Sequence, residues 1–91
     1  MSAKFPLGQI VATPGALELL QQVGRSPLEF ITRHVQGDWG ELDEHDKLLN
    51  EQDLAHGGRL LSSYIVTDNR RLWVITEYDR SASTLLLPSE Y

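Results

Sequence analysis

Histidine has the widest chemical range of the residues in this sequence, because imidazole can bind a metal ion or move a proton near neutral pH. His34, His45 and His56 recur at a spacing of eleven residues. Zinc motifs on helices instead place ligands about three or four residues apart, so that both reach one ion. The chain has no cysteine, which removes thiolate metal sites, disulfides and a thiol nucleophile. We therefore expect no metal site and no cofactor.

Nucleophilic catalysis needs a nucleophile, a base within hydrogen-bond reach and a group that orients the base. No serine stands in a nucleophile-elbow sequence, and no histidine falls in a recognised catalytic arrangement. The pair Gly57-Gly58 precedes a predicted strand, and Gly37 with Gly40 brackets a tryptophan. Neither pair has the form of a phosphate-binding loop, which enters a helix and has a lysine nearby. The prediction is a protein without enzymatic activity.

The charge of the chain is concentrated in one segment. Eight Lys and Arg residues stand against 13 Asp and Glu residues, a formal net charge of -5. Residues 38–53 hold seven acidic residues and one lysine, so this acidic segment carries -6 and the rest is nearly neutral. Such a segment is either a solvated face or an imitation of nucleic-acid phosphates that occupies a basic groove on another protein. The candidate partner-binding residues in it are Asp38, Trp39, Glu41, Asp43, Glu44, Asp46, Glu51 and Asp53.

Arginines flank the aromatic residues of the C-terminal half. Tyr64 and Trp73 lie in predicted strands, an arrangement loosely similar to an aromatic sheet on which bases stack. Residues 54–80 carry a net charge of only +1, and nucleic acid and anionic membranes both require a cationic field. We therefore expect neither as a direct ligand, and a small nucleic-acid-binding regulator is the alternative function. The arginines concerned are Arg59, Arg70, Arg71 and Arg80.

Two capped helices are predicted before the acidic segment. Thr13-Pro14-Gly15-Ala16 has the N-cap and first-turn proline of a helix over residues 14–23, which Gly24 ends. Ser26-Pro27-Leu28-Glu29 has the capping-box spacing of a second helix, which Gly37 ends. The predicted inward stripe of this second helix is Leu28, Ile31 and Val35.

A third helix is predicted from its N-cap Asp43 to about Ala55, followed by Gly57 and Gly58. Its apolar face is meagre, so we expect this helix at the periphery of the molecule. The residues predicted to face inward are His45, Leu48, Leu49, Gln52 and Ala55.

After the third helix, apolar residues alternate with a period of two, which indicates strands. Residues 59–67 and 70–78 flank Asp68-Asn69, which suits a two-residue hairpin turn. The register predicted from this turn sets Tyr64 opposite Trp73. If helices cover only one side of the sheet, the other side is too apolar to stay open in a monomer. Either the third helix or the N-terminal arm covers it, or it is a homodimer surface or the docking site of a partner. The face predicted to be open carries Leu60, Tyr64, Val66, Trp73 and Ile75.

These elements define a single α+β domain over residues 1–91. Two or three N-terminal helices pack on a three- to four-stranded antiparallel sheet, with residues 83–87 as the third strand and residues 8–12 as a short fourth. The hydrophobic share of 41% and the charged share of 23% fit a folded domain. Residues 1–6 lack the apolar stretch of a signal peptide, and no apolar run could span a membrane, so we expect a cytoplasmic protein.

Several segments carry a resemblance: FPLGQIVATPGA at residues 5–16, HVQGDWG at residues 34–40, and RLWVITEYDRS at residues 71–81 with TLLLPSEY after it. They resemble a small family of uncharacterised bacterial proteins found on plasmids and on integrated or phage-derived elements. The resemblance runs over nearly the whole chain and implies no activity or catalytic residue. It implies a context, because mobile elements often carry small proteins that bind and modulate host machinery, including inhibitors of defence systems.

The sequence therefore favours a non-enzymatic accessory protein that binds a host protein. The predicted contact is the acidic segment or the sheet face of Tyr64 and Trp73. A sharper form of the hypothesis is an inhibitor of a host nuclease or of a CRISPR or restriction complex, whose basic nucleic-acid groove the acidic side chains would occupy.

Overall fold

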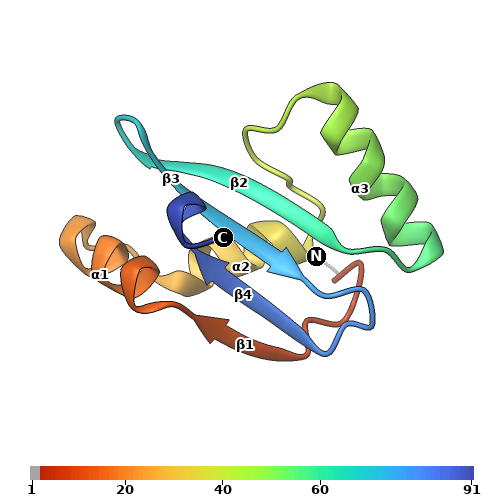
Figure 1. Ribbon diagram of the computed structural model, residues 1–91, viewed down its shortest axis with the longest axis horizontal. Coiled ribbons are helices and arrows are strands. Elements are labelled where there is room, and N and C mark those ends of the chain that lie inside the picture. The colour runs from red at the N-terminus through yellow and green to blue at the C-terminus, as the bar shows by residue number, and fades with distance from the viewer. Residues whose placement is uncertain (1–2) are drawn as a thin grey trace.

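The computed structural model describes residues 3–91, in which three helices and one four-stranded sheet form an α+β fold (Figure 1). Met1 and Ser2, which begin the segment without signal-peptide character, lie outside the described residues. The predicted α+β class is confirmed. The elements are β1 (Gln9–Ala12), α1 (Pro14–Val23), α2 (Pro27–Val35), α3 (Glu44–His56), β2 (Leu60–Thr67), β3 (Arg70–Thr76), β4 (Ala82–Leu86) and the short 3-10 helix η1 (Pro88–Glu90).

The sheet has the strand order β1-β4-β3-β2 (Figure 1). The meander β2-β3-β4 is antiparallel as predicted, but β1 pairs with β4 in parallel. The expectation of a wholly antiparallel sheet is therefore wrong at this one pair. Three helices and the hairpin separate β1 from β4 in the chain, so no tight turn sets the direction of their pairing.

Local capping sets the helix ends where the sequence predicted them. The Thr13 hydroxyl accepts a hydrogen bond from the N–H of Ala16, and Gly24 ends α1 in the left-handed region at φ 69°. The Ser26 hydroxyl accepts from the first turn of α2, but Glu29 forms an ion pair with Arg25, so the predicted reciprocal capping box is not formed.

The inward face of α2 is rotated from the predicted one. Phe30, Ile31 and His34 are buried, whereas Leu28, predicted to face inward, is 64% exposed. Both sets of residues satisfy the helical period, so only the contact of Phe30 with the sheet selects between them. The ring of Phe30 packs 5.5 Å from that of Tyr64 between centroids.

The inward face of α3 is not the predicted one: it holds the buried Asn50 and the partly buried Leu54. Asn50 is 4% exposed, while Leu48 and Leu49 are 56% and 42% exposed. The prediction that Leu48 and Leu49 face inward, together with His45, Gln52 and Ala55, is therefore wrong, although α3 is peripheral as expected. The physical reason is that α3 lies beside the edge strand β2 and bonds to its backbone through Asn50, as described below.

The register of the β2-β3 hairpin also differs from the prediction. The turn is at Asp68-Asn69 as expected, but the register shifts between Ile65 and Thr67, so Tyr64 pairs with Leu72. The extra residue is Val66, which forms a bulge in β2. Counted away from the turn, every pair beyond the bulge is shifted by one residue from the predicted register. Tyr64 and Trp73 consequently lie on opposite faces of the sheet.

The main core fills the space between the sheet and the helices α1 and α2. A smaller cluster of Phe5, Trp39 and Leu60 lies beside it. Leu60, Tyr64 and Val66, which were predicted on an open face, are all buried on the core side. The residues of the main core are Ala16, Leu19, Leu20, Phe30, Ile31, Tyr64, Val66, Leu72, Val74 and Leu85.

Candidate interaction surface

The sheet face turned away from α1 and α2 carries the half-buried Trp73 and the exposed Tyr91. Trp73 pairs with Ser63 and projects to this side, where the C-terminal turn η1 lies against β3 (Figure 1). Its ring packs edge to face against Tyr91, with 5.7 Å between the ring centroids. Ile75 and Leu86 on this side are buried, because η1 and Tyr91 cover part of the face. The sequence did not predict this C-terminal cover.

A hollow of about 200 Å³ lies between the sheet and the C-terminal residue Tyr91. Arg59 closes one side: its guanidinium stands 5.2 Å from the centre of the Tyr91 ring and donates a hydrogen bond of 2.8 Å to the Tyr91 hydroxyl. Leu61, Trp73 and Ile75 form the apolar floor. This hollow presents aromatic and aliphatic groups to solvent and has one cationic wall.

A second hollow, of about 470 Å³, shares Leu61 and Trp73 with the first and extends toward the start of α3. Three acidic residues and one arginine line its rim, so the two hollows together form one surface with an apolar centre and a charged border. We call this the Trp73 surface. Its residues are Leu61, Trp73, Ile75 and Tyr91 at the centre and Glu41, Asp43, Asp46, Arg59 and Arg71 at the rim.

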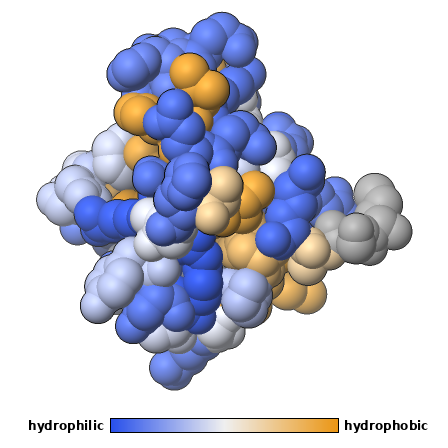
Figure 2. Space-filling model, turned by 90° about the vertical axis from the view of Figure 1, so that its right-hand side faces the viewer, coloured by the Kyte–Doolittle hydropathy of each residue, from blue (hydrophilic) through white to orange (hydrophobic). Residues whose placement is uncertain are grey.

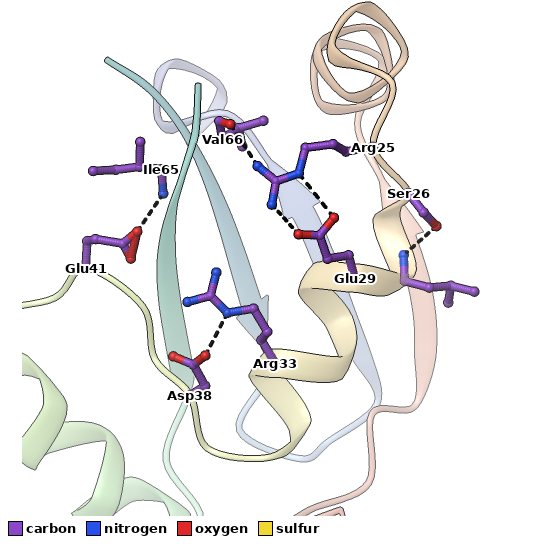
Figure 3. Close-up of polar contacts among 9 residues, drawn as sticks. Arg25, Ser26, Glu29, Arg33, Asp38, Glu41, Ile65 and Val66 are labelled. Carbon is purple, nitrogen blue, oxygen red and sulfur yellow. Dashed lines mark hydrogen bonds and ion pairs between the residues drawn. The ribbon is translucent and has the colours of Figure 1, made fainter. Parts of the chain in front are cut away.

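The structure thus brings three predicted acidic residues to Trp73, and two of them also hold the backbone through hydrogen bonds. Glu41 accepts a hydrogen bond of 3.1 Å from the N–H of Ile65 (Figure 3). Asp43 is the N-cap of α3 and accepts from the N–H of Asp46 at 2.8 Å. Asp46 is exposed and contributes charge to the rim.

The other acidic residues lie outside the Trp73 surface. Asp38 forms an ion pair of 2.6 Å with Arg33 (Figure 3), and this hydrogen-bonded cation holds the pKa of the Asp38 carboxyl below its usual value. Glu44 is almost fully exposed, with the Lys47 ammonium 3.7 Å away. Asp53, in the last turn of α3, accepts through its backbone carbonyl the N–H of both following glycines. α3 is on the right of Figure 1, and that side is largely hydrophilic with separate hydrophobic patches (Figure 2).

Two predicted contact residues are buried. Trp39 is 4% exposed, and its indole N–H donates a 2.7 Å hydrogen bond to Glu51. Tyr64 is fully buried and its hydroxyl donates to the carbonyl of Asp38 at 2.6 Å. Burial raises the pKa of Tyr64 well above its usual value. The prediction that Tyr64 and Trp73 share an open face is wrong, and neither Trp39 nor Tyr64 offers side-chain area to a partner.

The acidic segment covers the outer edge of β2. The Asn50 amide donates to the carbonyl of Leu61 at 2.6 Å and accepts from its N–H at 3.1 Å. Ser63 donates its N–H to the Trp39 carbonyl and accepts the N–H of Glu41. With the bond from Glu41 to Ile65, three N–H groups and two carbonyls along this edge are hydrogen-bonded. Asn50 was not predicted as a buried residue; the available signal in the sequence was an amide of low helix propensity in the middle of a helix.

A buried hydrogen-bonded group of His34 and three hydroxyl residues was also not predicted from the sequence. His34 Nδ1 lies 2.6 Å from the Ser62 hydroxyl, and His34 Nε2 lies 2.9 Å from the Thr76 hydroxyl, which continues to Ser83 at 2.6 Å. The three hydroxyl residues and His34 are all fully buried and line neither of the two hollows of the Trp73 surface. Desolvation, and secondly the charge of Arg80, lowers the pKa of His34 from 6.5 to about 4. This group therefore satisfies polar atoms within the core.

Within residues 3–91, no helix has the length and apolar character needed to cross a membrane. The same residues contain no cluster of three His, Asp or Glu side chains placed to hold a metal ion.

Comparisons with protein-family models, with curated proteins and with solved structures give no match. The resemblance to small proteins of plasmids and phage-derived elements consequently stays a prediction, and the surface has to be interpreted from its own geometry.

Proposed function

We propose that this protein is a non-enzymatic accessory protein of a mobile element and that it binds a host protein in the cytoplasm. The observation that carries the proposal is the Trp73 surface, in which Trp73, Leu61 and Tyr91 form an apolar centre with charged residues at the border. Aromatic residues at the centre and polar residues at the rim are typical of protein interfaces, where Trp and Tyr contribute much of the binding energy.

The charges at the rim favour a partner with a basic segment next to an apolar one. Asp46, in the first turn of α3, is exposed, and Glu41 and Asp43 stand beside Trp73. Their field would attract a cationic segment toward the apolar centre. In the sharper form of the proposal, that cationic segment is the nucleic-acid groove of a host nuclease or of a CRISPR or restriction complex, and its occupation inhibits the complex.

The alternative, a nucleic-acid-binding regulator, has less support from the geometry. Tyr64 lies in the core, so it cannot stack a base beside Trp73. Arg71 donates to the Ser63 hydroxyl and adjoins the acidic rim, while Arg80 donates to the carbonyls of Gly58 and Asp53. The carboxylates of Glu41, Asp43 and Asp46 beside Arg71 weaken the cationic field that phosphate would need.

A pull-down from extract of a bacterial host tests the proposal with matched variants. We expect the wild type to retain a host protein that Trp73→Ala and Asp46→Lys lose. Two control variants change exposed residues away from the Trp73 surface: Leu28→Ala removes an apolar group from α2, and Glu18→Lys reverses a charge on α1. Both controls should retain the host protein.

Equal retention by all five proteins would overturn the proposed contact. A mobility-shift assay with single-stranded and double-stranded nucleic acid at about 50 mM salt tests the alternative, because phosphate contacts are strongest at low salt. Binding there that Trp73→Ala abolishes would favour the regulator over the protein-binding factor.

A further inference from the structure

The two edges of the sheet differ in how their backbone groups are satisfied. At β2, the outer edge is occupied by Asn50, Glu41 and the backbone around Trp39. β1 forms the other edge and pairs only with β4. The N–H groups of Gln9 and Thr13 donate to β4 and its flank at 3.0 Å each, so alternate residues of β1 face inward.

The remaining groups of β1 point away from the sheet. Ile10 and Ala12 alternate with the residues that bond to β4, so in the parallel ladder their N–H and C=O groups point away from β4. The strand is short, which limits pairing at a natural edge, but Gln9–Ala12 contains no charge and no proline, and its pairing with β4 has an unbroken register. Ile10 and Val11 are 47% and 40% exposed.

We infer that β1 is a dimerisation edge, at which a second copy of this chain pairs through its own β1 in antiparallel orientation. A twofold axis at Val11 places each Val11 opposite the Val11 of the second copy. Ile10 then stands opposite Ala12 of the second copy, and these residues exchange N–H and C=O bonds, four in all by symmetry. The large side chain of Ile10 meets the small one of Ala12, which avoids a clash on that face.

The charge distribution favours a second copy at this edge. Each copy carries -5, which opposes association wherever the acidic segments approach one another. The acidic segment adjoins β2, at the end of the strand order β1-β4-β3-β2 opposite to β1. Pairing at β1 therefore sets the two acidic segments at the outer ends of an eight-stranded sheet. It also leaves the Trp73 surface of each copy free, since that surface lies over β2 and β3.

A four-residue strand buries little area, so the dimer is expected to be weak, with a Kd between about 10 μM and 1 mM. Analytical ultracentrifugation over that range should detect it. Val11→Lys places two ammonium groups face to face and should raise the Kd at least about tenfold. Leu28→Lys, the same kind of change at an exposed position of α2, should leave the Kd unchanged.

Amide hydrogen exchange by NMR identifies the interface directly. As concentration rises, the N–H groups of Ile10 and Ala12 should become protected in the wild type and in Leu28→Lys, but not in Val11→Lys. A chain that stays monomeric to about 1 mM would overturn the inference. So would a dimer that Trp73→Ala abolishes and Val11→Lys does not, or one that forms without protecting these two amides.

Discussion

Acidification from about pH 7.5 to about pH 5 is expected to destabilise the folded protein through His34. The side chain is fully buried, with each ring nitrogen held by a hydroxyl group, those of Ser62 and Thr76. Burial, with a smaller contribution from the charge of Arg80, lowers its pKa from 6.5 to about 4. Neutral imidazole can serve both neighbours, since one nitrogen donates and the other accepts.

The sign and size follow from the linkage between protonation and folding. Above about pH 6.5 His34 is neutral in both states and contributes no pH dependence. Between that pH and pH 4 the unfolded chain takes up a proton that the folded protein excludes, so the free energy of unfolding falls as the pH is lowered. Each pH unit is worth about 1.4 kcal/mol, which makes about 2 kcal/mol between pH 7.5 and pH 5 and about 3 kcal/mol at most.

Urea unfolding at a series of pH values, followed by tryptophan fluorescence, measures this dependence. The carboxyl groups with lowered pKa values lose their stabilising contribution only below their ordinary pKa values of 4.5 for Glu and 3.8 for Asp, so the interval from pH 7.5 to pH 5 isolates His34. His34→Gln should flatten the curve in that interval. His45→Gln, at an exposed position of α3, should keep the wild-type slope. An unchanged slope in His34→Gln would refute the reasoning.

Three further perturbations test the edge cover, a buried hydroxyl and a strained turn. Asn50→Ala should lower the free energy of urea unfolding by about 1 to 3 kcal/mol, because it removes both hydrogen bonds to β2. The control Gln52→Ala, at an exposed position of the same helix, should lower it by less than about 0.5 kcal/mol. Equal losses would contradict the role of Asn50 in covering the β2 edge. Tyr64→Phe should lower the free energy of unfolding by about 1 kcal/mol and leave partner capture intact. Loss of partner capture in this variant would show that Tyr64 is a contact residue after all. Gly40→Ala should be poorly folded by circular dichroism, because φ is 76° there and an added Cβ collides with a β2 carbonyl. The control Gly57→Ala, at φ 87° but in open space, should lower the free energy of unfolding by only about 1 kcal/mol. Similar losses in the two variants would show that the collision does not matter.

The functional interpretation depended on residues that the sequence singled out only in part. Trp73 and the acidic residues could be named from composition and charge. Tyr91 and Arg59, which complete the Trp73 surface, could not be assigned to it, because the C-terminal turn folds back over the sheet through contacts between residues distant in the chain. Tyr64 was wrongly grouped with Trp73, because one bulged residue in β2 reverses which residues share a face.

By itself the sequence determined the fold class, the helix ends, the hairpin turn and the concentration of charge at residues 38–53. These are local properties: a hydroxyl or carboxylate at an N-cap, a glycine at a C-cap and a two-residue turn act within a few positions of the chain. The tertiary structure alone decided which helix faces turn inward, the parallel pairing of β1, and the use of the acidic segment to cover the β2 edge. Those choices depend on backbone groups that must find partners across the molecule, and Asn50, polar and yet buried, satisfies that requirement where a leucine face could not.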